Sequence, residues 1–317
     1  MGILSKAWGW VAKDPHHLIG IRILQMAIGA ILLFEVVTNL PFAGYLWGPN
    51  GIGGGSMSDL LGPTLGDVVD TVFTADAYIF GMLFILILSA LGLLFGYWTR
   101  VSSFLALFSS FLINSRLPGF SDGGDNITRL VLVYMLFLLP HRAKFSSGQL
   151  RVWLHNIAVL AIIFQLIVMY TASGFFKSIG EWWREGTAMY YISQVQLYSL
   201  PGAYKLFSIP LIVYVATYAP LFYQLMFPMA IISHFKLPWI GLGILFHLGI
   251  AVLMGLITFS TVMIGLELFL ISDQEYAMIW NRGGLICKRL SRAVVCIVQK
   301  HARTRAAEAE ESTTTAG

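Results

Sequence analysis

The stretch Pro238–Ile271, PWIGLGILFHLGIAVLMGLITFSTVMIGLELFLI, contains only two ionisable side chains, His247 and Glu267. As one helix, its 34 residues would extend roughly 51 Å at about 1.5 Å per residue. The hydrocarbon core of a bilayer is only about 30 Å thick. The stretch therefore predicts two short membrane-crossing helices, with Gly255 near the bend between them.

The rest of the chain repeats this apolar character. Apolar residues make up 57% of the sequence and charged residues 11%, whereas a soluble domain carries about 25% charged residues. The sequence therefore predicts an all-α fold, a polytopic integral membrane helical bundle with about eight transmembrane helices. Apart from the final pair, the expected helices cover roughly residues 18–40, 77–97, 101–115, 127–140, 152–174 and 209–233.

The distribution of basic residues predicts the orientation. With eight crossings and a cytoplasmic N-terminus, the clusters around Lys6 and Arg289 both lie inside, as the positive-inside rule requires. The loop 41–76 has no Lys or Arg, so we expect a flexible outer loop; its GPNGIGGG run lacks the lysine of a phosphate-binding loop. We predict a bacterial cell membrane protein whose partner is the lipid bilayer, with no nucleic-acid partner. The expected parts are a cytoplasmic N-terminal segment 1–17, a transmembrane domain 18–272, a basic amphipathic cytoplasmic segment 273–305 and a disordered tail 306–317.

A few polar residues lie where lipid is expected. Lys177 follows a long apolar helix at the membrane edge, where a desolvated lysine can act as a base or nucleophile, or can simply lie at the interface. His247 and Glu267 each allow a proton-handling or a purely structural role. Arg22 is expected to snorkel toward the cytoplasmic end of its helix. No spacing predicts a metal site, and a disulfide between Cys287 and Cys296 is not expected on the reducing side.

Three segments carry a family resemblance. They are LLFGYWTRVSS from Leu93, NSRLPGFSDGGDNITRLVLVYMLFLLP from Asn114 and SGFFKSIGEWWREGTAMYY from Ser173. In this order they resemble the horizontally transferred transmembrane (HTTM) family, whose membrane region is shared with vitamin K-dependent gamma-glutamyl carboxylases. The resemblance runs from about Ile19 to Ile271.

The resemblance implies site residues. Lys177 matches the catalytic lysine of the family and Trp182 its tryptophan, while His247 belongs to a second matching motif with Phe259, Ser260, Val262 and Met263. Lys177 and His247 are therefore expected to be catalytic. Asp125 with Arg129 is expected to be a buried pair that shapes the cavity, and Trp182 and Glu185 are expected to support the substrate or the structure. The implied cofactor is a quinol, such as menaquinol or vitamin K hydroquinone, with no binding residues assigned.

The chain also departs from the carboxylases. The stretch LLPHRAKFSSG has Arg142 and Ala143 where they carry Asn-His, and their large lumenal domain has no counterpart in the 317 residues. The chain resembles the sporulation-delaying protein B type, which implies a maturation factor for an exported antimicrobial or toxin peptide. The implied partners are a secreted peptide precursor and a small companion maturation protein. Three alternatives stay open: a carboxylase-like lyase that uses a quinol, another peptide-modifying membrane enzyme, and a peptide-binding immunity or transport protein.

Overall fold

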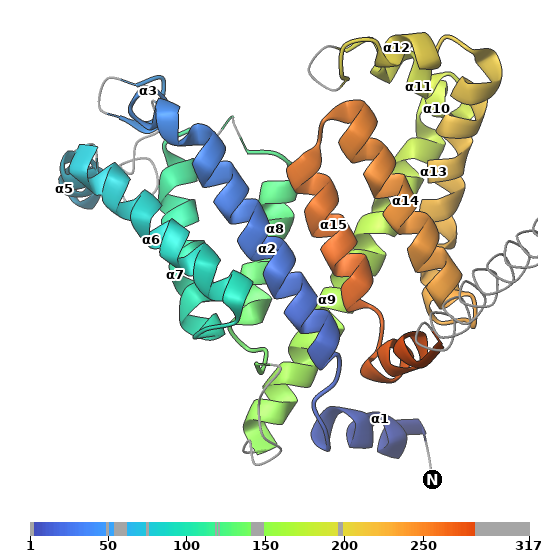
Figure 1. Ribbon diagram of the computed structural model, residues 1–317, viewed down its shortest axis with the longest axis horizontal. Coiled ribbons are helices and arrows are strands. Elements are labelled where there is room, and N and C mark those ends of the chain that lie inside the picture. Colours follow the sequence, from blue (N-terminus) through green and yellow to red (C-terminus); the bar gives the residue numbers. More distant parts are fainter. Residues whose placement is uncertain are drawn as a thin grey trace, which may run out of the picture. The chain divides into compact units, whose positions relative to one another are not determined.

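The computed structural model describes residues 3–48, 51–53, 62–73, 76–117, 119, 121–140, 149–195 and 199–282, and every regular element in them is helical (Figure 1). The all-α prediction is therefore confirmed. The chain divides into two units, Met1–Ile271 and Ser272–Gly317. The second unit opens with a capped helix start, in which the Glu275 carboxylate accepts hydrogen bonds from the Ser272 amide and hydroxyl at 2.7 and 2.8 Å.

Every apolar run singled out in the sequence coincides with a helix of the first unit. Five helices in the described part of the chain are long and apolar enough to cross a membrane, or six if α15 and the helix after it count as one broken span. Membrane character is thus supported, and the count of eight crossings stays a prediction. The helices that coincide with the apolar runs are α2 (Leu18–Asn39), α6 (Asp76–Phe95), α7 (Thr99–Ser115), α8 (Gly123–Met135), α9 (Gln149–Ile179), α13 (Pro210–Ile231), α14 (Lys236–Met254) and α15 (Ile257–Phe269).

The last apolar stretch is broken where its length required a break. α14 ends at Met254 and α15 begins at Ile257. Between them, Gly255 has a φ of 71°, in the left-handed region that glycine enters without steric penalty. The prediction of two helices with Gly255 at the bend is confirmed.

Shorter helices fill the connections, and the sequence analysis missed them. The loop 41–76 was predicted to be flexible, and this is wrong for two of its segments, because η1 (Leu40–Phe42) leads into α3 (Ala43–Trp47), and α5 starts at Pro63, a residue suited to a first helical turn. The predicted segment 283–303, the tail 306–317, Cys287, Cys296 and Arg142 lie outside the described residues. The other short helices are α1 (Ile3–Ala12), α5 (Pro63–Phe73), α10 (Glu181–Arg184), α11 (Ala188–Ile192) and α12 (Ala203–Leu206).

The first unit has two groups of helices joined through its middle. α2 packs against α6 and α15, α6 packs against α7, and α9 packs against α13. Figure 1 shows α15 between α2 and α14. Small residues allow the closest crossings: a Cβ at Gly20 would lie 2.7 Å from the Phe269 carbonyl oxygen, and one at Gly29 would lie 2.7 Å from that of Ala90. Such contacts are typical of packed membrane helices.

Two arginines close the ends of neighbouring helices. The Arg22 guanidinium donates to the carbonyl of Leu93 at 2.7 Å and to that of Leu94, the last carbonyls of α6. Arg100 donates from Nε to the Leu138 carbonyl at 3.2 Å, just past α8. Carbonyls at the end of a helix lack a full set of partners within the helix, and cations there interact favourably with the helix dipole. The snorkelling predicted for Arg22 misses this role, because the guanidinium binds a neighbouring helix.

A buried polar cluster fastens the N-terminal segment to the start of α9. We call it the anchor cluster, and it consists of His16, His155 and Asn156 with the backbone around them. The Asn156 amide donates to the carbonyls of Val11 and Asp14 at 2.9 and 2.8 Å and accepts from the His16 amide at 3.2 Å. His155 accepts from the Leu139 amide at 2.9 Å through Nδ1, and its Nε2 lies 2.9 Å from the His16 carbonyl oxygen.

Candidate functional site

A second buried polar cluster lies between α9, α13, α14 and α15. We call it the proton cluster, and it consists of Tyr170, Tyr223, His247 and Glu267. The Tyr170 and Tyr223 hydroxyls donate to Glu267 Oε1 at 2.5 and 2.9 Å. The Tyr170 hydroxyl also lies 2.8 Å from His247 Nε2, and that nitrogen is 3.6 Å from Glu267 Oε1. All four side chains are buried, so this is a connected network of proton-carrying groups inside an apolar bundle.

Aromatic packing and one small residue position the cluster. The Tyr223 ring stacks on Trp239 with centroids 5.5 Å apart, and the Tyr170 ring lies 4.2 Å from Phe227. Gly243 on α14 faces the polar groups: a Cβ there would lie 2.1 Å from the Tyr223 hydroxyl and 2.2 Å from Glu267 Oε1. Only glycine leaves the two phenols and the carboxyl room to meet on one oxygen.

The proton cluster is incompletely hydrogen-bonded. His247 Nδ1 and Glu267 Oε2 are buried and have no hydrogen-bond partner among the described residues. Buried polar atoms normally find partners, and an unsatisfied one costs about 1–3 kcal/mol. Unpartnered atoms on groups that can exchange protons are typical of sites that receive a ligand, a water or a proton.

Lys177 lies on the same face of α9 as the proton cluster. It follows Tyr170 by seven residues, which is close to two turns and about 10 Å along the helix. Its half-buried ammonium donates to the Ser173 hydroxyl at 2.6 Å and lies 5.2 Å from the centre of the Trp183 ring. Within the described residues no hydrogen bond joins Lys177 to His247, the pair expected to work together.

The aromatic partner of the lysine is the residue that follows the tryptophan of the motif. Trp183, and not Trp182, presents its ring face to the Lys177 ammonium, an arrangement that favours a cation. Trp182 is 54% exposed and stacks on Tyr191 with centroids 4.6 Å apart. Glu185 is exposed just after α10. Trp182 and Glu185 therefore belong to the surface around Lys177.

Asp125 and Arg129 lie in the first turns of α8. Asp125 forms a capping box with Asp122: each carboxylate accepts a hydrogen bond from the other's amide, at 2.8 and 2.9 Å. Partial burial raises the pKa of the Asp125 carboxyl, which precedes the apolar part of the helix. The Arg129 guanidinium donates to Ser121 at 2.8 Å and Asn126 at 3.2 Å, and it interacts with Asp125 only through the electrostatic field. The two residues are half-buried and stabilise the start of the helix.

One aromatic ring separates this helix start from the proton cluster. The Phe259 ring lies edge-on to His247 with centroids 5.7 Å apart. On the α8 side, a Cβ at Gly124 would lie 3.0 Å from Phe259 Cα, and one at Gly123 would lie 4.0 Å from the Phe259 ring. Phe259 therefore stands between the first turn of α8 and the imidazole.

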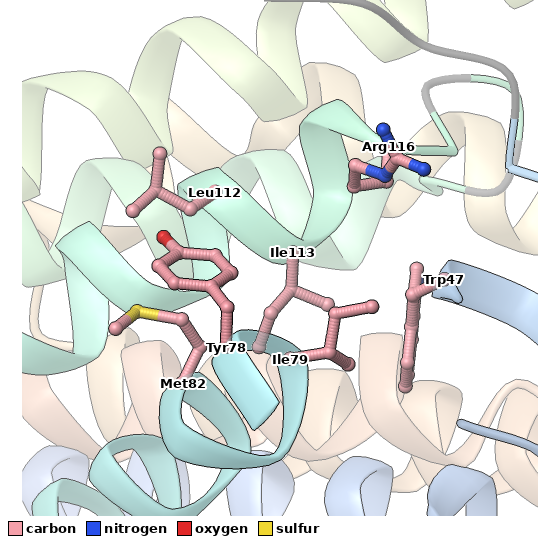
Figure 2. A pocket seen from close by; sticks show the side chains of 7 residues that line it. All are labelled: Trp47, Tyr78, Ile79, Met82, Leu112, Ile113 and Arg116. Atoms are coloured by element: carbon pink, nitrogen blue, oxygen red, sulfur yellow. The ribbon is translucent and has the colours of Figure 1, made fainter. Parts of the chain in front are cut away.

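A separate pocket lies between α3, α6 and α7 (Figure 2). The empty space between its side chains, including the part that opens to the outside, is about 310 Å³. Figure 2 shows the Tyr78 hydroxyl near Leu112, with the Arg116 guanidinium farther along the pocket. None of the predicted catalytic residues lines it. The lining residues are Trp47, Tyr78, Ile79, Met82, Leu112, Ile113 and Arg116.

The site does not establish a place for a metal or a quinol. Within the described ranges, no group of three His, Cys, Asp or Glu side chains could hold a metal ion. The unpartnered atoms of His247 and Glu267 have the polarity to meet the hydroxyls of a quinol. Ring-sized space beside them is not provided by the Figure 2 pocket or by a smaller pocket between α8, α9 and α15.

Sequence reasoning missed most of the proton cluster. Tyr170 could have been found from the helical repeat, because residues seven apart share a helix face and Lys177 was already singled out. Glu267 was noted but not connected to His247, since their contact depends on how α14 and α15 fold back on each other. Tyr223 lies in TYAPLFYQ among other aromatic residues, and nothing in that run distinguishes it.

Comparison with known proteins adds no family to this description. No protein-family model matches the chain, and no curated protein or solved structure matches it. The candidate site therefore depends on the geometry alone: a half-buried lysine, a helix face leading inward and a buried network of four proton-carrying side chains.

Proposed function

We propose that this chain is a bacterial cell-membrane protein of the HTTM type that matures an exported peptide by proton-transfer chemistry. Lys177 is the base that meets the substrate at the membrane edge, and the proton cluster is the buried partner site. Both termini lie in the cytoplasm, and Lys177 faces the opposite side. The secreted precursor and a small companion protein are its partners.

The observation that carries the proposal is the polar face of α9. Lys177, Ser173 and Tyr170 are spaced so that all three lie on one side of the helix, and Lys177 is hydrogen-bonded to Ser173. Tyr170 continues the polar face to His247 and Glu267. A line of groups that can give or accept a proton thus leads from the half-buried lysine into the bundle, where such groups are expensive and usually functional.

The chemistry of a lysine in this setting supports the role. Amines placed in apolar surroundings act as general bases, and the Trp183 ring and Ser173 hydroxyl hold this amine in place. The surface around it, with Trp182 stacked on Tyr191 and the α11 helix, offers aromatic area to a peptide at the membrane interface. The amine takes one proton from the substrate, and no electron transfer is required of the chain.

Replacement of the lysine tests this proposal. Secreted peptides from host cells that carry the wild-type gene, a deletion or Lys177→Ala would be compared by mass spectrometry. We expect the mature peptide to fall at least 100-fold with Lys177→Ala, as in the deletion, because general base catalysis contributes about 10²–10⁴-fold. The matched control is Lys205→Ala, which removes an exposed lysine of α12 and should leave the peptide unchanged.

A binding role predicts a different outcome. If the chain only binds the peptide, as an immunity or transport protein would, Lys177→Ala should leave the amount of mature peptide within about twofold of the wild type. Pull-down of the unprocessed precursor with purified Lys177→Ala protein separates the two roles. Precursor retained without maturation supports chemistry at Lys177, and normal maturation by this variant overturns the proposal.

A further inference from the structure

The two phenols of the proton cluster leave little freedom in how its protons are arranged. Each hydroxyl has one proton, and both hydroxyls donate to the same oxygen, Glu267 Oε1, at 2.5 Å from Tyr170 and 2.9 Å from Tyr223. Once the Tyr170 proton is directed at the carboxyl, the phenol oxygen can only accept in its remaining contact. That contact is with His247 Nε2 at 2.8 Å.

The tautomer of the imidazole follows from this arrangement. If the Tyr170 oxygen accepts, Nε2 of His247 must carry the hydrogen, and Nδ1 must carry the lone pair in the neutral ring. Nδ1 has no hydrogen-bond partner among the described residues, although the side chain is only 1% exposed. The network thus directs one nitrogen to Tyr170 and leaves the basic nitrogen available.

The surroundings of the ring contain no second base at hydrogen-bonding distance among the described residues. The ionisable groups of the cluster come from α9, α13 and α15, namely Tyr170, Tyr223 and Glu267. The other described ring neighbours are apolar: Phe246 at 4.9 Å and Phe259 at 5.7 Å between centroids. Phe259 separates the ring from the first turn of α8. A proton that reaches Nδ1 must therefore come from an incoming molecule or water.

We propose that Glu267, acting through Tyr170, is a positioning residue that fixes His247 in the Nε2–H tautomer and leaves Nδ1 as the proton acceptor of the buried site. A carboxylate often orients a catalytic imidazole directly, and here a tyrosine hydroxyl stands between them. This inference rests on the proposed function in one respect only, namely that the proton accepted by Nδ1 comes from the substrate. The tautomer itself follows from the geometry.

Nitrogen NMR of the histidine ring tests the tautomer without any activity assay. Protein labelled with ¹⁵N-histidine would be measured in lipid nanodiscs at a pH where the ring is neutral, with the His247 signals identified by their loss in His247→Asn. We expect hydrogen on Nε2 in the wild type. Tyr170→Phe removes the phenol oxygen, and Glu267→Met removes the acceptor for the phenol proton at a similar side-chain length. Both variants should lose this preference and give a mixture of tautomers or the Nδ1–H form.

Tyr223→Phe is the matched control, because this phenol binds Glu267 but is not hydrogen-bonded to His247. It should keep the Nε2–H tautomer. Hydrogen on Nδ1 in the wild type, or an unchanged tautomer in Glu267→Met that still folds by circular dichroism, would falsify the proposal. Failure of the proposed function looks different: maturation would then survive Lys177→Ala while the NMR result stands.

Discussion

The anchor cluster and the proton cluster each include residues of the same helix, α9, yet the two clusters differ in how completely they are hydrogen-bonded. In the anchor cluster, both nitrogens of His155 have partners and the Asn156 amide uses both of its ends. In the proton cluster, His247 Nδ1 and Glu267 Oε2 have none among the described residues. A satisfied network stabilises a fold, whereas a partly satisfied one keeps atoms available for chemistry. By this criterion the anchor cluster has a structural role, whereas the proton cluster has the atoms that a ligand, a water or a proton could reach.

The largest effect on stability should come from the anchor cluster. Asn156→Leu keeps a similar volume but leaves the carbonyls of Val11 and Asp14 and the His16 amide without their partner. At about 1–3 kcal/mol for each buried unsatisfied group, we expect a loss of roughly 3–5 kcal/mol. Unfolding in detergent would measure it. Gln149→Leu, at the exposed start of the same helix, is the control and should change stability by less than about 0.5 kcal/mol.

A glycine pair on α14 tests how tightly the proton cluster is packed. A methyl group at Gly243 would collide with the Tyr223 hydroxyl and Glu267, so Gly243→Ala should destabilise the protein by about 1–3 kcal/mol and reduce maturation at least tenfold. At Gly241 a Cβ meets nothing within 4 Å, so Gly241→Ala should leave both quantities near wild type. Equal behaviour of the two variants, in melting temperature and in mature peptide, would show that the cluster geometry is wrong.

The Phe259 ring separates the proton cluster from the first turn of α8. Phe259→Leu keeps the site apolar but removes the ring that stands between His247 and Gly123. We expect a loss of about 1–2 kcal/mol, since the core is only partly refilled, and faster hydrogen–deuterium exchange at the His247 ring. Exchange at His155 in the anchor cluster should not change. An unchanged rate at His247 would contradict the role of Phe259 as a barrier.

The smallest effect should come from the exposed rim. Glu185→Gln removes a charge that is exposed just after α10, so we expect a stability change within about 0.5 kcal/mol. If Glu185 only supports the surface near Lys177, the yield of mature peptide should fall by less than about threefold. A loss as large as that of Lys177→Ala, measured in the same secretion assay, would move Glu185 into the chemistry.

The helices were predictable because each is a continuous apolar run; the last run had to break because of its length, and Gly255 was the residue suited to the bend. The clusters were not, because each one joins residues far apart in the sequence: 97 positions separate Tyr170 from Glu267, and 145 separate Asn156 from Val11. Lys177 and His247 were identified as polar residues in apolar surroundings, but their partners depend on packing. The contact of Trp183 with Lys177 was likewise not predictable, since adjacent residues point about 100° apart on a helix and spacing to a motif does not fix which of two tryptophans faces the lysine.

Because α9 is one continuous helix, the distance between the two clusters and their relative rotation around its axis are fixed. Asn156 and Tyr170 are fourteen residues apart, roughly 21 Å along one continuous helix. One end of α9 is bound to the N-terminal segment, and the other end carries Tyr170 and Lys177. The helix therefore sets the distance of the amine from the anchored end and its direction around the helix axis. An inserted residue between the clusters would turn one against the other by about 100°. The contacts of Asn156 with the N-terminal segment therefore bear on the direction of the Lys177 side chain through the rotation of the helix that the two residues share.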